Sequence, residues 1–199
     1  MKETYIDSRE DMIITYIKDK DILDLWAWDI RDRFLHKFLV DNAKSVVWIE
    51  LMKYKVENMK KHWYNLVEWN AETLDLWKKY DVVIAWDLIE HVDNAWLFLE
   101  NVKRHLKKDG VFIFNTPNAY AINFLVKWLL SWGTVHQFYE HVTLFNEELI
   151  INLLNRFGIK IEKTIYFTHK ENNFKSYILR LFWKISKKWN ENMLFICKI

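Results

Sequence analysis

The stretch from Ile22 to Asp29 reads I-L-D-L-W-A-W-D, an apolar run that contains an acid and leads into Trp26 and Trp28. With glycine at positions 26 and 28, it becomes a strand followed by a glycine-rich turn of the kind that binds nucleotides. Such a turn needs residues without a Cβ, because the ligand approaches the backbone there. The run therefore predicts a cofactor-binding turn, which indole side chains would fill.

Glycine is scarce throughout the chain. There are 12 tryptophans and only 3 glycines in 199 residues, whereas glycine makes up about 7% of ordinary proteins. Ten tryptophans fall at predicted strand ends, helix ends or loops: Trp26, Trp28, Trp48, Trp63, Trp69, Trp77, Trp86, Trp96, Trp132 and Trp189. Our hypothesis is that UGA codons, which some bacterial lineages read as glycine, are written here as tryptophan. The alternative is a genuinely tryptophan-rich protein.

Two clusters of titratable side chains could move a proton. Their members are Asp87, Glu90 and His91 in the first cluster, and His136, Tyr139, Glu140 and His141 in the second. A histidine is the natural base near neutral pH. We predict His141 as the first candidate for a general base and His136 as the second. The alternative for His141 is a structural hydrogen bond that holds a loop.

The elements that must position these residues follow from an alternation of short apolar runs and longer helical patterns, which is typical of βαβ units. Strands are predicted at Asp21–Leu25, Ser45–Glu50, Asn65–Glu68, Tyr80–Ala85, Gly110–Asn115, Lys160–Phe167 and Met193–Lys198. Helices are predicted at Ser8–Lys18, Ile30–Val40, Met52–His62, Asn94–Leu106, Ala119–Leu130 and Asn146–Phe157. The two clusters follow the fourth and fifth strands, at the carboxyl edge of the sheet.

This order predicts an α/β fold: a Rossmann-like, doubly wound, mostly parallel seven-stranded sheet with an antiparallel C-terminal strand. We expect one domain over residues 1–199, with a core at 20–115, an acceptor or lid region at 116–145, and a C-terminal helix and strand pair at 146–199. The length suits a single core.

Bulk properties exclude several classes of protein. A net charge of +2 lacks the basic surface of a nucleic-acid binder, so no nucleic-acid partner is expected. A single cysteine, Cys197, excludes a disulfide framework and a cysteine-based metal site. The polar N-terminus is no signal peptide, and no run of about 18 apolar residues predicts a spanning helix. We expect a cytoplasmic protein.

From the first strand to about Leu149 the chain resembles the class I S-adenosylmethionine-dependent methyltransferases, especially the quinone-biosynthesis-type O-methyltransferases. Four stretches in the family's order carry the resemblance: Ile22–Asp29, Val46–Glu50, Glu68–Glu72 and Asp81–Val92. The segments Leu106–Phe114 and Thr116–Asn118 extend it. The resemblance implies S-adenosylmethionine as the cofactor and transfer of its methyl group to a small molecule, most simply to an oxygen. Quinone precursors, sugars and lipid-linked intermediates all fit as acceptors.

The resemblance also implies a cofactor site. Glu50 would accept from the two ribose hydroxyls, Asp24 would orient the turn or accept from the cofactor's amino group, and Asn70 with Ala71 would contact adenine. The alternatives are a solvated strand-end acid for Glu50 and a structural turn acid for Asp24. The full implied set is Asp24, Trp26, Trp28, Asp29, Glu50, Leu51, Asn70, Ala71, Glu72, Trp86, Asp87 and Leu88.

Two departures weaken parts of this assignment. Family members often carry Asp at position 70 and a third glycine near position 30, where this chain has Asn70 and Ile30. Some quinone methyltransferases hold a divalent metal, but Glu90 beside His91 is by itself no metal signature. No metal site is predicted.

Two further segments bear on the acceptor. Ala119–Ser131 is apolar on most faces and could cover an apolar acceptor or pack as a core helix. Phe174–Lys188 carries five basic residues and no acid, a pattern that suits either an anionic membrane surface or a solvated helix face. Two rival functions stay open: a nicotinamide-dependent oxidoreductase on a similar sheet, and a non-catalytic binding module if the tryptophans are real.

Overall fold

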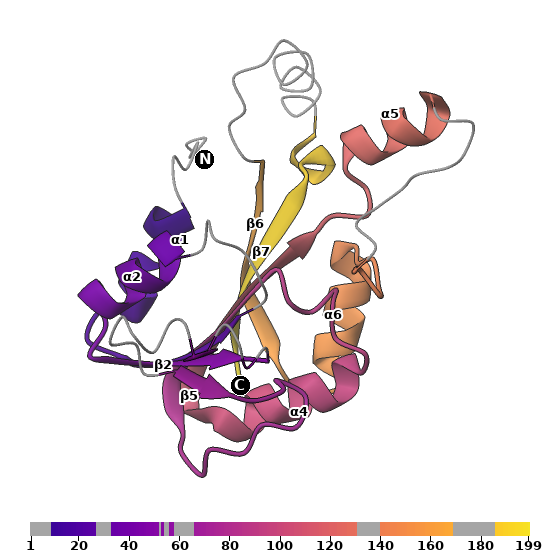
Figure 1. Cartoon of the computed structure of the whole chain (residues 1–199). Coiled ribbons are helices and arrows are strands. Elements are labelled where there is room, and N and C mark those ends of the chain that lie inside the picture. The colour runs from indigo at the N-terminus through magenta and orange to yellow at the C-terminus, as the bar shows by residue number, and fades with distance from the viewer. Residues whose placement is uncertain are drawn as a thin grey trace.

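The fold is taken from a computed structural model that describes residues 9–26, 33–51, 53, 56–57, 66–130, 140–168 and 186–199. Within these residues, strands form one seven-stranded sheet in the order β3-β2-β1-β4-β5-β7-β6 (Figure 1). The strands are β1 Asp21–Trp26, β2 Ser45–Glu50, β3 Leu66–Glu68, β4 Tyr80–Trp86, β5 Leu106–Pro117, β6 Lys160–Phe167 and β7 Asn192–Lys198. The helices are α1 Arg9–Ile17, α2 Arg33–Asn42, α4 Ala95–His105, α5 Ile122–Leu130 and α6 Glu147–Asn155, with a 3-10 turn η2 at Lys187–Trp189.

Strand directions confirm the predicted fold class. The strands from β3 to β5 pair in parallel, while β7 runs antiparallel to both β5 and β6. The chain crosses from β2 and β3 back to β4 on the far side of β1, so the strand order reverses beside β1. Ligands of open α/β sheets bind at such a reversal, beyond the carboxyl ends of the strands.

Apolar side chains cover the sheet on both faces, as a mostly parallel sheet requires. Helices α1 and α2 lie on one face, where Ile13, Ile17 and Leu39 pack against strand residues such as Ile22 and Ile84. Helices α4 and α6 lie on the other face (Figure 1). Each large aliphatic or aromatic side chain buried in this way stabilises the fold by roughly 1.5–3 kcal/mol.

Asparagine caps set the starts of two helices. Asn94 accepts from Trp96 N (3.0 Å) and Leu97 N (3.1 Å), so α4 begins at Ala95. Asn146 accepts from Leu149 N (2.9 Å) and caps α6. Both satisfy backbone donors that the first helical turn leaves without a partner.

The starts of β5 and α5 differ from the predictions by several residues. Strand β5 begins at Leu106 instead of Gly110, because the chain enters the sheet directly where α4 ends. Helix α5 begins at Ile122 instead of Ala119, because the Asn118 side chain accepts from Tyr120 N (3.1 Å) and holds a turn there. Of the predicted helix Met52–His62, only residues 53 and 56–57 are described, and these are helical.

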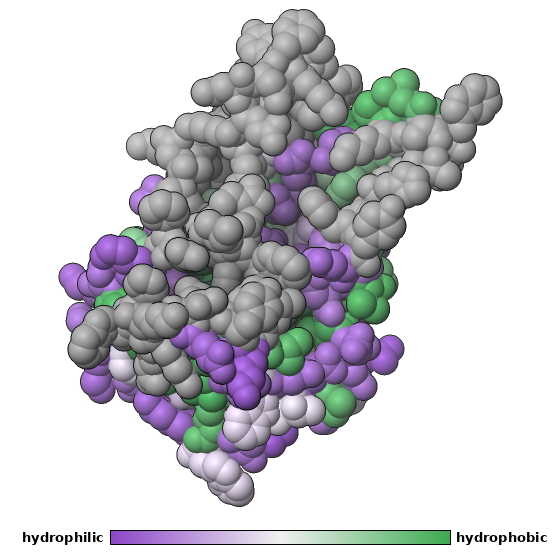
Figure 2. Space-filling view, viewed as in Figure 1, coloured by the Kyte–Doolittle hydropathy of each residue, from purple (hydrophilic) through white to green (hydrophobic). Residues whose placement is uncertain are grey.

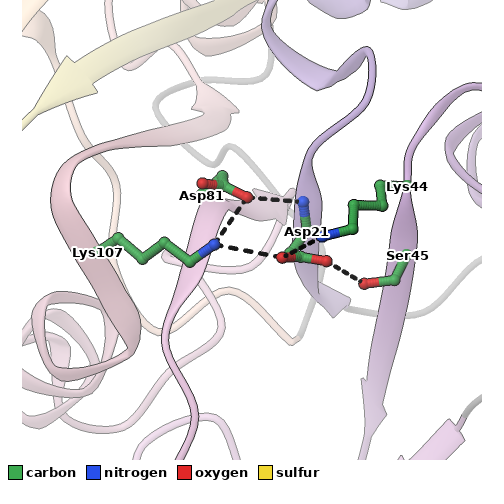
Figure 3. Close-up of polar contacts among 5 residues, drawn as sticks. All are labelled: Asp21, Lys44, Ser45, Asp81 and Lys107. Carbon is green, nitrogen blue, oxygen red and sulfur yellow. Dashed lines mark hydrogen bonds and ion pairs between the residues drawn. The ribbon is translucent and has the colours of Figure 1, made fainter.

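A polar network ties the amino ends of the parallel strands, at the edge opposite the candidate site (Figure 3). Lys107 Nζ donates to Asp81 (3.0 Å) and to Asp21 (3.2 Å). Asp21 also accepts from Ser45 Oγ (2.7 Å), and its backbone N–H donates to Asp81 (2.9 Å). The Ser45 hydroxyl and the Lys107 ammonium lower the pKa of Asp21 to about 2. The network therefore joins β1, β2, β4 and β5 in one register.

Candidate functional site

The carboxyl ends of β1, β2 and β4 bring the predicted cofactor residues to one edge of the sheet. Register pairs Trp26 with Trp86, and Glu50 pairs with Glu68 on the neighbouring strand. Leu51, Asp87 and Leu88 follow these strand ends directly, and so do residues 70–72 after β3. Trp28, Asp29 and His136 lie outside the described residues, so their roles stay predictions.

Asp24 lies on the face of β1 that α2 covers, and it is buried. Its carboxylate accepts from Nδ1 of His36, 3.0 Å away, and His36 is buried as well. The ring of Trp48 packs on the imidazole with 4.0 Å between centroids. His36 is a partner that the sequence predictions missed. The only signal is a polar residue beside Leu35 on the buried side of an amphipathic helix.

Glu50 is 4% exposed at the end of β2, so the alternative of a solvated strand-end acid is wrong. Its backbone carbonyl accepts from Trp69 N (3.0 Å), which draws the chain after β3 to this strand end. A buried carboxylate here suits the bidentate acceptor that a pair of ribose hydroxyls requires.

The segment after β3 folds into a tight turn. Asn70 Oδ1 accepts from Glu72 N (2.7 Å), so the side-chain oxygen predicted for adenine is turned toward its own backbone. Glu72 Oε1 accepts from Asp93 N (2.9 Å), and the Glu72 carbonyl accepts from Asn101 Nδ2. The turn is thereby joined to the start of α4, which leaves the backbone of residues 70–71 as the better candidate for an adenine contact.

Asp87 leaves β4 with a φ of +44°. Its backbone N–H donates to Asn115 Oδ1 (3.0 Å), and Asn115 Nδ2 donates back to the Asp87 carboxylate. Asn115 is buried on β5 and was not predicted, because an asparagine at a strand end carries no distinctive pattern. The reciprocal pair fixes the Asp87 carboxylate beside the candidate site.

Described members of the two predicted clusters of titratable residues meet in the structure, while His136 and Tyr139 lie outside the described residues. The Glu90 carbonyl accepts from Val142 N (2.8 Å), and His91 Nδ1 donates to the Glu140 carbonyl (3.0 Å). The rings of His91 and His141 meet edge to face with 4.7 Å between centroids. Residues 140–142 are thus held against the loop that follows β4.

Burial favours the uncharged forms in this cluster. Burial raises the pKa of Glu90 to about 8, and the nearby Asp87 carboxylate acts in the same direction, while the Thr116 hydroxyl opposes it. Burial, and then the charge of His91, lowers the pKa of His141. A neutral imidazole can accept a proton, so the cluster holds a base beside a carboxyl group that retains its own proton.

The same cluster has the donors of a cation site. One ligand atom each from Glu90, His91 and His141 lies within 4.8 Å of the others. A carboxylate with two imidazoles is a set that several transition metals accept. The sequence predicts no metal here. The geometry makes binding of a divalent cation by these three residues the alternative to their role in proton transfer.

The tryptophans of the candidate recoding set differ in environment. Trp48 and Trp86 are fully buried. Trp77 is 94% exposed and has a φ of +51°, in the left-handed region that favours glycine. Trp63 and Trp132 lie outside the described residues.

Comparison with known proteins agrees with this arrangement. Residues 26–164 match the model of the family described as "Methyltransferase domain". A protein of Rickettsia bellii strain OSU 85-389 named ubiquinone biosynthesis O-methyltransferase is 29% identical over 158 residues, 74% of this chain and 64% of that one. A protein of the same name from Rickettsia conorii is 38% identical over 73 residues, which are 34% of this chain and 25% of that one. The chain thus spans less than two thirds of the length of these curated relatives.

Solved structures share the fold at low sequence identity. A methyltransferase described as SAM-dependent, from Archaeoglobus fulgidus, has a TM-score of 0.68 at 15% identity and covers 98% of this chain and 93% of its own. One from Clostridium acetobutylicum has a TM-score of 0.64 at 15% identity, with coverages of 95% and 88%. The family match favours a methyltransferase over a nicotinamide-dependent oxidoreductase. The chain therefore belongs to the methyltransferase domain family and has the fold of the S-adenosylmethionine-dependent methyltransferases.

Proposed function

We propose that the chain binds S-adenosylmethionine at the carboxyl edge of β1, β2 and β4 and transfers its methyl group to an oxygen of a small molecule. The observation that carries this proposal is the gathering of Asp24, Glu50 and the Glu90–His91–His141 cluster at one edge of a methyltransferase-family sheet. The names of the Rickettsia relatives favour a quinone precursor as the acceptor. Sugars and lipid-linked intermediates are the alternatives.

The described residues fit the cofactor's chemistry. The buried Glu50 carboxylate suits two ribose hydroxyls, and Asp24 stands two residues before the turn at 26–28, where an acid can accept from turn N–H groups or an ammonium group. The same edge of the sheet is bordered by Leu51, Trp86, Asp87 and Leu88. The proposed set of cofactor-binding residues also includes Trp28 and Asp29, which are assigned from their positions in the sequence.

Proton transfer is assigned to His141. When bound, the cofactor presents a methyl group on a positively charged sulfur. During methyl transfer from the bound cofactor, the His141 imidazole would accept the proton that the acceptor hydroxyl gives up. Replacement of His141 by Gln should lower kcat by about a hundredfold and leave cofactor affinity unchanged. An unchanged kcat would transfer this role to His136.

Glycine at the ten suspect positions is part of the proposal. It accounts for the composition, for the turn at 26–28, and for the left-handed backbone of Trp77. UGG codons at these positions would contradict it. In that case a non-catalytic binding module becomes the better function, since indoles at 26, 28 and 86 would crowd the cofactor.

The test is calorimetric titration of S-adenosylmethionine into two proteins: one with glycine at the ten positions and one with the printed tryptophans. We expect binding at micromolar concentration, about −8 kcal/mol, by the glycine form alone. A well-folded glycine form that does not bind would remove the function and leave the fold. Equal binding by both forms would remove the recoding hypothesis and keep the function.

A further inference from the structure

We infer that His36 is a positioning residue of the cofactor site, which holds the Asp24 carboxylate in place through its Nδ1–H. The inference rests on the proposed placement of the cofactor next to Asp24. Because His36 belongs to α2, this helix contributes to the cofactor site together with the turn at 26–28.

Both residues of the Asp24–His36 pair are buried. Asp24 is 4% exposed and His36 is 3% exposed. A carboxylate buried to this extent is costly without a hydrogen-bonded partner. An ionised carboxylate can only accept, so the 3.0 Å contact places the proton on Nδ1 of the imidazole. His36 therefore supplies the hydrogen bond that holds the Asp24 carboxylate in one orientation.

The helix holds His36 in this position. Leu35 and Leu39 on α2 are buried against the sheet, and α1 packs alongside in the same core cluster. His36 shares this buried side, so its ring has little freedom to leave the strand. The hydrogen bond to Asp24 does not involve Trp48, so we expect the same pair whether position 48 is tryptophan or glycine.

Orientation matters because Asp24 stands at the sheet edge where the proposed turn begins. A carboxylate fixed in one rotamer presents its oxygens to the same hydrogen-bond donor in every molecule. A carboxylate that changes rotamer does so only part of the time. Loss of the His36 contact should therefore weaken cofactor binding through its effect on Asp24.

The buried residue His105 offers a matched control. It is 2% exposed on α4, on the opposite face of the sheet. Its Nδ1 donates to the Asn101 carbonyl (2.8 Å), and its Nε2 accepts from Leu76 N (3.1 Å). Replacement by leucine at 36 or at 105 removes a comparable buried imidazole, but only the change at 36 reaches Asp24.

The experiment compares His36→Leu, His36→Asn and His105→Leu in the glycine form by calorimetric titration of S-adenosylmethionine. The Asn amide can donate from near the position of Nδ1. We expect His36→Leu to weaken binding by about tenfold or more, as for a lost hydrogen bond to a charged group. His36→Asn should restore most of the affinity, and His105→Leu should weaken binding less than His36→Leu does at a comparable loss of melting temperature. Equal affinity of His36→Leu and the parent would overturn the inference.

Amide hydrogen exchange gives a second readout that needs no cofactor. In His36→Leu, the peptide that spans residues 21–35 should exchange faster than in the parent, while His105→Leu should leave that peptide unchanged. Equal exchange in the two leucine variants would overturn the inference even if no form bound the cofactor. A parent that fails to bind contradicts the proposed function alone, so the two failures are distinguishable.

Discussion

At the scale of single residues, the side chains that surround each acid of the site decide what that acid can do. Asp24, Glu50 and Glu90 are all buried, yet their surroundings differ. Asp24 has a hydrogen bond from a buried imidazole, whereas the pKa of Glu90 is raised by burial and by the Asp87 carboxylate. The Asp24 carboxylate is thereby held in one orientation, and Glu90 is kept protonated near neutral pH.

The raised pKa of Glu90 predicts a pH-dependent stability. Its folded-state value of about 8 lies above the ordinary 4.5, so the folded chain binds more protons than the unfolded chain between these values. Stability is therefore highest below the lower value and is lost as pH rises through the higher one. Glu90→Gln removes the charge, and should stabilise the fold at pH 9 by on the order of 2 kcal/mol.

Urea unfolding at pH 5 and pH 9, with a metal chelator present, measures this difference. The exposed neighbour Glu140, replaced by Gln, is the control and should show no comparable gain at pH 9. A Glu90→Gln variant less stable than the parent at pH 9 would mean that the ionised carboxylate has a partner in the folded state. A divalent cation at Glu90, His91 and His141 would then be the first candidate for that partner.

The sequence predicted single site residues, but it could not predict which side chains would form hydrogen bonds with them. Asp24 and Glu50 were identified because each ends an apolar strand, which is a local pattern. His36 and Asn115 were missed because their roles come from contacts across the sheet, 12 and 28 residues from their partners. No local pattern reports which side chain on a helix or a neighbouring strand will face a given acid.

At the scale of elements, the strands were predicted closely because their apolar runs are short and clearly bounded. The start of β5 was placed four residues late, since the polar residues Lys107–Asp109 resemble a loop. They belong to the sheet because Lys107 forms ion pairs with Asp81 on the neighbouring strand β4 and with Asp21 on β1. Polar residues in a strand become predictable only when their partners are known.

The network at the amino ends of the strands predicts a second pH effect, opposite in sign to that of Glu90. The pKa of Asp21 is lowered to about 2, first by the Ser45 hydroxyl and then by Lys107. Its contribution is therefore present above the ordinary value near 3.8 and is lost as pH falls toward 2. Ser45→Ala should destabilise the fold by about 1 kcal/mol at pH 7, and the difference should shrink below pH 4.

Lys44→Gln is the matched control, because Lys44 is exposed and lies 3.6 Å from Asp21. A long contact of this kind at the surface contributes little, so the control should change stability less than Ser45→Ala. Denaturant unfolding between pH 3 and pH 7 measures both. A Ser45→Ala variant with the parent's stability at pH 7 would show that the network does not hold the strand register.

At the scale of the whole molecule, the candidate site and an exposed apolar helix lie toward the same end of the sheet. Helix α5 stands away from the sheet (Figure 1), and Figure 2 shows a hydrophobic area in its position. Leu129 and Leu130 are 62% and 78% exposed. Asn123 Nδ2 donates to Glu191 Oε1 (2.8 Å), and Asn118 Nδ2 donates to the Lys188 carbonyl (2.8 Å). These contacts tie the start of α5 to the lysine-bearing turn η2.

This arrangement supports a proposal that α5 contacts an anionic membrane surface. In the part of the chain that the structure describes, helices are too short or too polar to cross a membrane. A helix with exposed leucines at its end, and with a lysine-bearing turn at its start, suits a position in the lipid interface. The basic stretch Phe174–Lys188, mostly outside the described residues, adds positive charge by sequence. A lipid-linked or quinone-like acceptor could then reach the site without leaving the membrane.

Co-sedimentation with lipid vesicles tests this contact. The protein should sediment with vesicles that contain phosphatidylglycerol and not with phosphatidylcholine alone, since lysines recognise the anionic headgroups. Serine at both Leu129 and Leu130 should weaken sedimentation by about tenfold, because two leucines leave the lipid. Serine at Leu149, 51% exposed on α6, is the control and should leave binding intact. Equal loss in both variants would assign the effect to general surface polarity, and equal binding by all forms would place α5 away from the membrane and favour a water-soluble acceptor.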